Sequence, residues 1–131
     1  MPGTTPNSYE TTYILRPGLS ESDASLVHQK IDNVIQKFQG QLKTRDDWGI
    51  KEMAYPIKKE GSGRYTVAVY TGVGGVVEEI ERHFRISDDV LRFITVSVAP
   101  EYDYETIKKQ IYLAEEEVKK NREARKKGQQ L

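Results

Sequence analysis

Residues 46–59 read Asp46-Asp47-Trp48-Gly49-Ile50-Lys51-Glu52-Met53-Ala54-Tyr55-Pro56-Ile57-Lys58-Lys59, and this stretch carries most of the information about the fold. Apolar and polar side chains alternate along it, which is typical of a β-strand. The alternation changes phase in the middle, because the apolar positions are first Trp48 and Ile50, then Met53, Tyr55 and Ile57. A phase change turns the later side chains to the opposite face of a sheet, so we expect a β-bulge near Lys51 and Glu52.

The residues around the phase change and after it predict a bent hairpin. Gly49 tolerates unusual backbone angles and therefore fits a bend. Pro56 has no N–H to donate to a ladder, so it indicates an edge strand or the end of a strand. Residues 58–63 form a polar turn, and a second apolar strand follows over residues 64–71. Basic side chains are expected around the tip of this hairpin.

The rest of the chain supplies two helical patterns and two further strands. The expected order is strand (9–16), helix (20–40), strand, strand, helix (76–84) and strand (90–98). This order is the split βαβ plan repeated twice, so we predict an α+β, ferredoxin-like fold with a four-stranded antiparallel sheet. Right-handed crossovers would place both helices on one face of that sheet.

Composition limits the domain organisation and the location of the protein. The chain has 131 residues, no cysteine and 20 basic residues that balance 20 acidic ones. The absence of cysteine excludes disulfides and thiolate metal sites, and it agrees with a reducing cytoplasm. No apolar run is long enough to span a bilayer. We expect a disordered N-terminus (1–8), one domain (9–99) and a charged, partly helical C-terminal extension with a basic end (100–131).

Catalytic chemistry is poorly supported by the sequence. His28 and His83 lie among charged residues on different helices, so we interpret both as solvated surface residues. The paired acids Asp46-Asp47 and Asp88-Asp89 stand in turns, where capping explains them better than acid–base catalysis. No spacing of metal ligands is present. We therefore expect no catalytic residues, no metal and no cofactor.

Three segments in the right order resemble the bacterial small-subunit ribosomal protein six family. The first is Tyr9 to Pro17, the second joins Asp47-Trp48-Gly49 to Met53 through Lys59, and the third is Phe84 to Phe93. The resemblance covers about residues 8–99. It implies a structural constituent of the small ribosomal subunit that binds the central domain of small-subunit rRNA together with small-subunit ribosomal protein eighteen. It implies neither an enzyme nor a small-molecule substrate.

Candidate binding residues fall into two sets. Basic residues at strand ends and at the hairpin tip would contact phosphates, and a tyrosine would stack on unpaired bases. With the positions implied by the resemblance, the expected rRNA-binding residues are Tyr9, Lys51, Lys58, Lys59, Arg64, Arg85 and Arg92. The strands are apolar on both faces, which suggests a covered sheet. The expected protein-partner residues are Tyr65, Val67, Val69, Tyr102 and Tyr104.

The extension has a distinct pattern. A narrow helical stripe is formed by Ile107, Ile111, Ala114 and Val118, and the last fourteen residues carry six basic residues against Glu123, a net charge of +5. Such a segment is typical of a helix that docks on a partner, with a disordered basic end. One alternative function stays open: a ferredoxin-like protein-interaction module without an RNA role.

Overall fold

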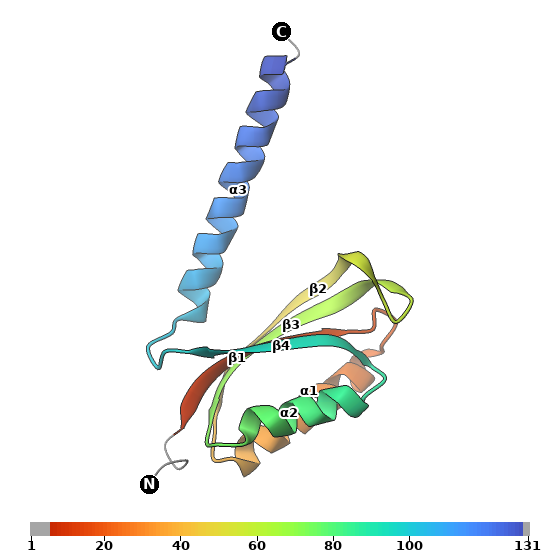
Figure 1. The fold of residues 1–131 in the computed structure, drawn as a ribbon, viewed down its shortest axis with the longest axis vertical. Helices are drawn as coiled ribbons and strands as arrows, with labels where there is room; N and C mark the ends of the chain where they lie inside the picture. The colour runs from red at the N-terminus through yellow and green to blue at the C-terminus, as the bar shows by residue number, and fades with distance from the viewer. Residues whose placement is uncertain (1–5, 130–131) are drawn as a thin grey trace. The chain divides into compact units, whose positions relative to one another are not determined.

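The computed structural model describes the backbone of residues 6–129 and the side chains of residues 6–126 (Figure 1). Its elements are β1 (Asn7–Leu15), α1 (Glu21–Lys37), β2 (Leu42–Ile57), β3 (Glu60–Gly72), α2 (Val76–Ile86), β4 (Val90–Val98) and α3 (Tyr104–Gln129). The chain divides into two compact units after Pro100. β1 begins at Asn7, two residues before the expected boundary. The expectation for residues 1–5 lies outside the described residues.

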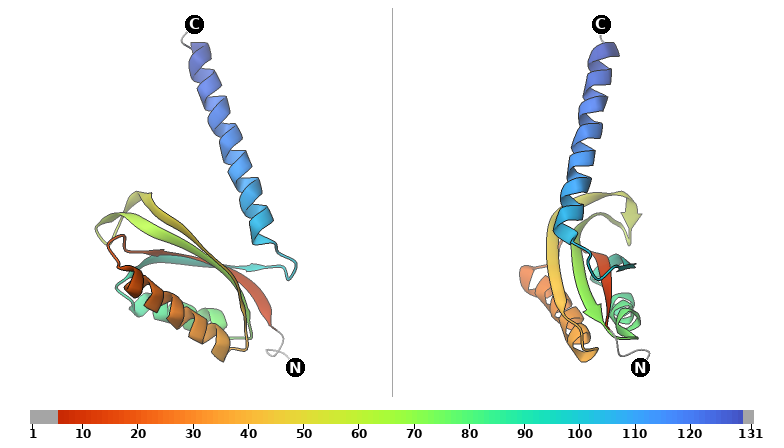
Figure 2. Two further views of the ribbon diagram at one scale, coloured as in Figure 1. Left: turned by 180° about the vertical axis from the view of Figure 1, so that it is seen from behind. Right: turned by 90° about the vertical axis from the view of Figure 1, so that its left-hand side faces the viewer.

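The first unit is a four-stranded sheet in the order β2-β3-β1-β4, in which every neighbouring pair is antiparallel. Helices α1 and α2 lie on one face of this sheet (Figures 1 and 2). The predicted ferredoxin-like fold is therefore confirmed. The other face of the sheet carries neither helix of this unit.

The hydrophobic core lies between the sheet and the two helices. Ser20 caps α1, because its side chain accepts a hydrogen bond from the Asp23 N–H at 3.1 Å. α1 then buries Ala24, Val27, Ile31, Val34 and Ile35, and α2 buries Val76, Ile80 and Phe84. From the sheet, the fully buried rings of Tyr13 and Tyr70 pack against these side chains.

A polar network ties α1 to the edge strand β2. The Tyr13 hydroxyl lies 2.6 Å from His28 Nδ1, and Arg45 Nε donates to the same hydroxyl at 3.3 Å. Arg45 also donates to both carboxylate oxygens of Asp32, at 2.6 and 3.1 Å. The Tyr13 hydroxyl accepts from Arg45 and can donate its own proton to His28 Nδ1 when that nitrogen carries no proton. His28 is therefore a half-buried member of this network, and its interpretation as a solvated surface residue is wrong.

The environment of this network shifts two pKa values. Burial raises the pKa of Tyr13 to about 12. Burial, and secondarily the Arg45 charge, lowers the pKa of His28 below its ordinary value of 6.5. Both shifts favour the neutral forms of Tyr13 and His28, in which the hydroxyl can donate to Nδ1.

β2 contains a β-bulge at Trp48, and a separate irregularity begins at Glu52, where the sequence pattern predicted one. Asp47 pairs with Thr66 and Gly49 pairs with the next residue, Tyr65, so Trp48 is the extra residue. Gly49 takes a left-handed backbone conformation, with φ at 78°. The alternation of side chains alone could not fix this position, because an edge strand exposes apolar residues on both faces. The β2–β3 ladder has two further irregularities, between Leu42 and Thr44 and between Glu52 and Ile57.

The turn of the hairpin is much tighter than the six-residue turn expected from the sequence. Ile57 pairs with Glu60, so only Lys58 and Lys59 form the loop. Both have positive φ angles, 50° and 69°, as in a type I′ turn. Such a turn has the right-handed twist of the flanking strands. Glu60 pairs with Ile57, and after the irregularity the ladder resumes with Ser62 and Gly63 opposite Glu52 and Lys51.

The hairpin curls over the helix-free face until its tip reaches the opposite edge of the sheet (Figure 2). Lys58 Nζ donates to the Val90 carbonyl at 3.0 Å, and an Arg92 guanidinium nitrogen donates to the Tyr55 hydroxyl at 3.1 Å. β2 and β4 are nonetheless the two edge strands of the sheet. The bulge at Trp48 and the irregularity between Glu52 and Ile57 allow this curl, because such irregularities bend a strand and increase its twist.

Lowering the pH from 7.5 to 5 should destabilise the protein through His28. The unfolded chain binds a proton near pH 6.5, whereas the folded chain resists it, so the free energy of unfolding falls once the pH drops below about 6.5. Urea unfolding at several pH values would measure this slope. In His28→Gln the slope between pH 7.5 and 5 should flatten, whereas His83→Gln, the matched control, should keep it. An equal slope in wild type and His28→Gln would contradict the prediction.

Replacing Gly49 by alanine should cost about 1–2 kcal/mol of unfolding free energy, since an L-residue is strained in the left-handed region. Gly61→Ala is the matched control. A Cβ meets nothing within 4 Å at either glycine, and only Gly49 has a positive φ. Gly61→Ala should leave stability unchanged or raise it by up to about 1 kcal/mol. Denaturant unfolding of both variants measures the difference, and equal effects would show that the bulge conformation is not the cause.

Candidate nucleic-acid interface

The helix-free face of the sheet is identified by strand pairing. Tyr13 pairs with Thr66 and Phe93 on the helix-covered face. Its neighbour Thr12 points to the opposite face, where it pairs with Val67 and Ile94. The helix-free face therefore presents Glu10, Thr12 and Ile14 from β1, Tyr65, Val67 and Val69 from β3, and Ile94 and Val96 from β4.

Exposed apolar surface on this face lies on β4, in Ile94 and Val96, which we call the β4 patch. Their exposed fractions are 58% and 47%, whereas Val67 and Val69 are only 2% and 3% exposed. β3 is a central strand with a neighbour on each side, and β4 is an edge strand with one side open. The sequence expectation placed the partner surface on β3. The sequence shows that Ile94 and Val96 alternate with polar residues. It does not show that the strand carrying them is an edge strand.

Val90 does not share a face with this patch, although its position in the sequence alternation suggests that it should. A register shift between Ile14 and Leu15 changes the phase of the β1–β4 ladder, and Val90 packs into the core under the helices. The exposed run on β4 therefore begins after this irregularity.

The curled hairpin brings three cations close to one end of β4. Lys58 and Lys59 form the turn, and Arg92 lies on the helix-free face opposite Ile14. We call Lys58, Lys59 and Arg92 the tip cluster; all three are exposed. The Val90 carbonyl holds Lys58 and the Tyr55 hydroxyl holds Arg92, and neither of these partners carries a charge. The hydrogen bonds thus position the cations without neutralising them.

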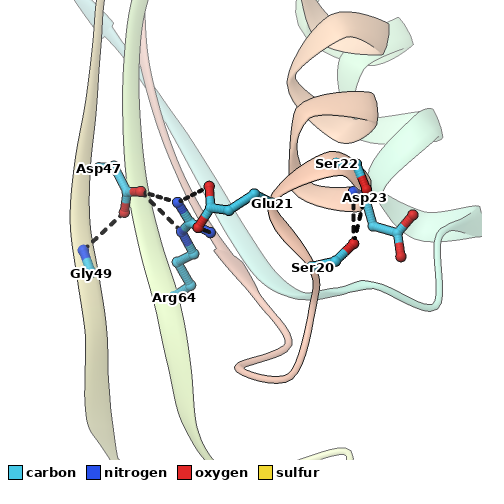
Figure 3. A network of polar contacts seen from close by, with 7 residues as sticks. All are labelled: Ser20, Glu21, Ser22, Asp23, Asp47, Gly49 and Arg64. Carbon is cyan, nitrogen blue, oxygen red and sulfur yellow. Dashed lines mark hydrogen bonds and ion pairs between the residues drawn. The ribbon is translucent and has the colours of Figure 1, made fainter.

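Arg64 lies elsewhere and has its charge balanced inside the protein (Figure 3). Its guanidinium donates to Asp47 at 2.5 and 2.9 Å and to both carboxylate oxygens of Glu21, at 2.9 and 3.2 Å. The Arg64 side chain is 17% exposed. These two acids raise the pKa of Arg64, and Arg64 in turn lowers the pKa of Asp47. Arg64 therefore joins β3 to α1 and β2 and is not part of the tip cluster.

The Asp47 carboxylate also stabilises the bulge. Its second oxygen accepts a hydrogen bond from the Gly49 N–H at 2.9 Å, the Asx-turn arrangement (Figure 3). Trp48, which lies between Asp47 and Gly49 in the sequence, donates a hydrogen bond from its indole N–H to the Asp46 carboxylate at 2.8 Å. The Asp47-Trp48-Gly49 motif thus has a structural explanation. Asp47 accepts the hydrogen bond that closes the bulge, Trp48 is the extra residue, and Gly49 takes the left-handed backbone conformation.

The remaining expected rRNA-binding residues lie apart from the tip cluster. Tyr9 is half-buried on the helix-covered face, with its ring centroid 5.8 Å from that of Tyr70. Lys51 places its ammonium 4.6 Å from the centre of the Trp48 ring, beside the bulge. Arg85 is in the last turn of α2, where its guanidinium lies 3.6 Å from Glu81. The structure therefore brings together only part of the expected set.

Tyr102 and Tyr104 belong to the second unit, which consists mainly of α3. Asp103 caps the helix, because its carboxylate accepts from the Thr106 N–H at 3.4 Å and also from the Thr106 hydroxyl at 2.8 Å. α3 then continues through the basic residues, which were expected to be disordered, up to Gln129. Its exposed large apolar side chains are Ile111, Tyr112, Leu113 and Val118.

Features of other functional classes are missing from the part of the chain that the structure describes. No group of three or more histidine, aspartate or glutamate side chains there could hold a metal ion. Among the same residues, no helix has both the length and the hydropathy that crossing a membrane requires.

Comparison with known proteins gives a consistent family. A family model described as ribosomal protein S6 matches residues 8–97. The chain is 38% identical over 116 residues to the small ribosomal subunit protein bS6 of Pelobacter propionicus, covering 88% of this chain and 90% of that one. It is 39% identical over 93 residues to the protein of the same name from Trichlorobacter lovleyi, covering 71% and 76% of the two chains.

A solved structure agrees with the topology. The crystal structure of 30S ribosomal protein S6 from Thermotoga maritima superposes with a TM-score of 0.65 and covers 84% of this chain and 99% of that one. The two sequences are 22% identical, so this likeness concerns the fold alone.

Proposed function

The chain belongs to the ribosomal protein S6 family, and from that premise we propose that it binds the central domain of small-subunit rRNA together with small-subunit ribosomal protein eighteen. Its relatives are named as proteins of the small ribosomal subunit. We propose a structural rather than a catalytic role there. RNA binding rests chiefly on one observation, the tip cluster of Lys58, Lys59 and Arg92.

The tip cluster has the properties of a phosphate-binding surface. Its three cations are exposed, and the hydrogen bonds to Val90 and Tyr55 fix two of them in place. A side chain that is already positioned loses less conformational entropy when it binds. Lysine and arginine contacts of this kind supply affinity that is independent of sequence and sensitive to salt.

The β4 patch supports the protein partner. Ile94 and Val96 are exposed on an edge strand, on the face that neither α1 nor α2 covers. A protein that covers this patch would remove apolar surface from water. We therefore place protein eighteen against β4 and treat Tyr65, Val67 and Val69 as the sheet beneath the contact. This geometry lets one partner and one RNA bind adjacent parts of the same face.

A protein-interaction module without an RNA role is the alternative function, and the β4 patch is compatible with it. The two functions differ in their response to salt. Phosphate contacts release counterions, so affinity falls steeply as salt rises, whereas apolar docking lacks this steep dependence.

Neutralising the tip cluster should reduce the salt dependence of rRNA binding. For the triple variant Lys58→Gln, Lys59→Gln, Arg92→Gln, the slope of log affinity against log salt should become shallower by about 2–3, since each phosphate contact contributes roughly 0.7–0.9. Filter binding to a central-domain rRNA fragment across 50–200 mM salt, with and without protein eighteen, measures it.

The matched control is the triple variant Lys30→Gln, Lys37→Gln, Lys43→Gln, which removes three exposed cations from other parts of the unit. It should leave the slope close to that of wild type. Equal changes in both triple variants would indicate a general charge effect. Binding of the wild type that shows no preference over an unrelated RNA would contradict the rRNA proposal.

Placing a charge on the β4 patch should abolish the cooperation with protein eighteen. In Ile94→Asp and in Val96→Asp, docking would bury an unpaired carboxylate, so the affinity for the partner should fall tenfold or more. Leu26→Asp on α1 is the control, because Leu26 is 54% exposed but lies on the other layer. Isothermal titration with protein eighteen would measure all three variants. Loss of binding in Leu26→Asp alone would contradict the β4 site and indicate that protein eighteen binds the helix layer.

A further inference from the structure

We propose that the C-terminal half of α3 is a second RNA-phosphate binding site, formed by Lys119, Lys120, Arg122, Arg125 and Lys126. We call these five residues the α3 basic segment. They lie beyond residues 8–97, the part of the chain that the family model matches. The inference rests on the proposed function, because rRNA is the polyanion that the site would contact.

The first observation is that none of these cations is held by a carboxylate within ion-pair distance among the described residues. All five side chains are exposed, and no ion pair is found for any of them among the described residues. Arginines of the first unit behave differently: Arg16, Arg45, Arg64 and Arg82 each contact a carboxylate at 2.5–2.9 Å. The chain thus uses most of its body arginines internally and leaves the charges of α3 available.

The second observation is the helical arrangement. Because the helix continues to Gln129, the spacing of Lys119, Arg122 and Lys126 places them on one face. From Lys119 to Lys126 the helix rises by seven residue steps, about 10 Å along the axis at 1.5 Å per residue. An RNA backbone presents several phosphates over such a length. A disordered segment with the same composition would lack this fixed spacing.

The third observation is an apolar groove directly beside this basic face. It is lined by Ile111, Ala114 and Val118, and its polar wall holds two cations, Lys119 and Arg122, and one acid, Glu115. A ligand lying along α3 would therefore meet apolar surface and positive charge together. A nucleic-acid backbone offers both complements, since its sugars carry C–H groups and its phosphates carry the charge.

Neither the helix dipole nor a coiled coil accounts for the whole α3 basic segment. Cations near a helix C-terminus interact favourably with the dipole, but this effect is confined to the last turn. It can apply to Lys126 and not to Lys119, which lies ten residues before Gln129. A coiled coil with a second copy would need three to four heptads of apolar positions. The stripe supplies only Ile107, Ile111, Ala114 and Val118, after which its positions are taken by Asn121 and Arg125.

The test compares wild type with three full-length variants. They are the α3 variant Lys119→Gln, Arg122→Gln, Lys126→Gln, the body variant Lys30→Gln, Lys37→Gln, Lys43→Gln, and the apolar variant Ile111→Ala, Val118→Ala. Affinity is measured for the central-domain rRNA fragment and for an unrelated structured RNA, between 50 and 200 mM salt. Circular dichroism checks that the helix content is unchanged. Sedimentation equilibrium reports the oligomeric state.

Raising the salt from 50 to 200 mM should weaken RNA binding of both proteins. The fold-loss of affinity should be about 20–40 times smaller for the α3 variant than for wild type, as expected for three lost phosphate contacts. The body variant should resemble wild type. An α3 variant with the wild-type salt slope would overturn the inference. So would a concentration-dependent dimer that is lost in Ile111→Ala, Val118→Ala while the slope stays unchanged, since α3 would then bind a second copy.

The proposed function and this inference can fail separately. If wild type prefers the central-domain fragment and the α3 variant keeps its slope, only the α3 site is wrong. If wild type shows no preference between the two RNAs but the α3 variant has a shallower slope on both, the α3 site stands and the central-domain rRNA proposal falls.

Discussion

The Asp47 carboxylate is the constraint on which much of the first unit depends. One oxygen accepts from the Gly49 N–H and fixes the bulge, while the other accepts from Arg64, which also binds Glu21 at the start of α1. The bulge is thereby joined to the helix layer. Bending at the bulge carries the hairpin over the sheet, and the contacts of Lys58 with Val90 and of Tyr55 with Arg92 follow from that curl.

Polar side chains on the two sides of the sheet differ in whether their charges are balanced within the protein. On the helix-covered side, charges and hydroxyls are satisfied internally, as in the network of Tyr13, His28, Arg45 and Asp32. Groups of this kind must find partners because desolvation without a hydrogen bond is costly. On the helix-free side, the cations of the tip cluster are held by neutral oxygens and keep their charge for a ligand. For Arg45 and Arg92, the side of the sheet on which the guanidinium lies decides whether its charge is balanced inside the protein.

The fold was largely predictable from local patterns. Helical spacing in α1 and α2, alternation in the strands, and the order of the elements identified the ferredoxin-like plan, because these signals depend on residues a few positions apart. The candidate site was predictable only in part. Lys58, Lys59 and Arg92 were correctly expected near strand ends and the hairpin tip, but Arg64 carries the same charge nearby and is enclosed by two carboxylates. No local pattern distinguishes it from its neighbours.

The sequence by itself determined the family, the order of the elements, the edge position of β2 through Pro56, and the need for an irregularity between Trp48 and Met53. Only the tertiary structure decided that Trp48 is the extra residue, that the turn contains two residues, that His28 is half-buried, and that the exposed apolar patch lies on β4. The physical reason is that most of these properties depend on residues far apart in the sequence, such as His28 with Tyr13, Lys58 with Val90, and Ile94 with Thr12. Pairing register, burial and charge compensation are properties of the assembled layers and not of any one segment.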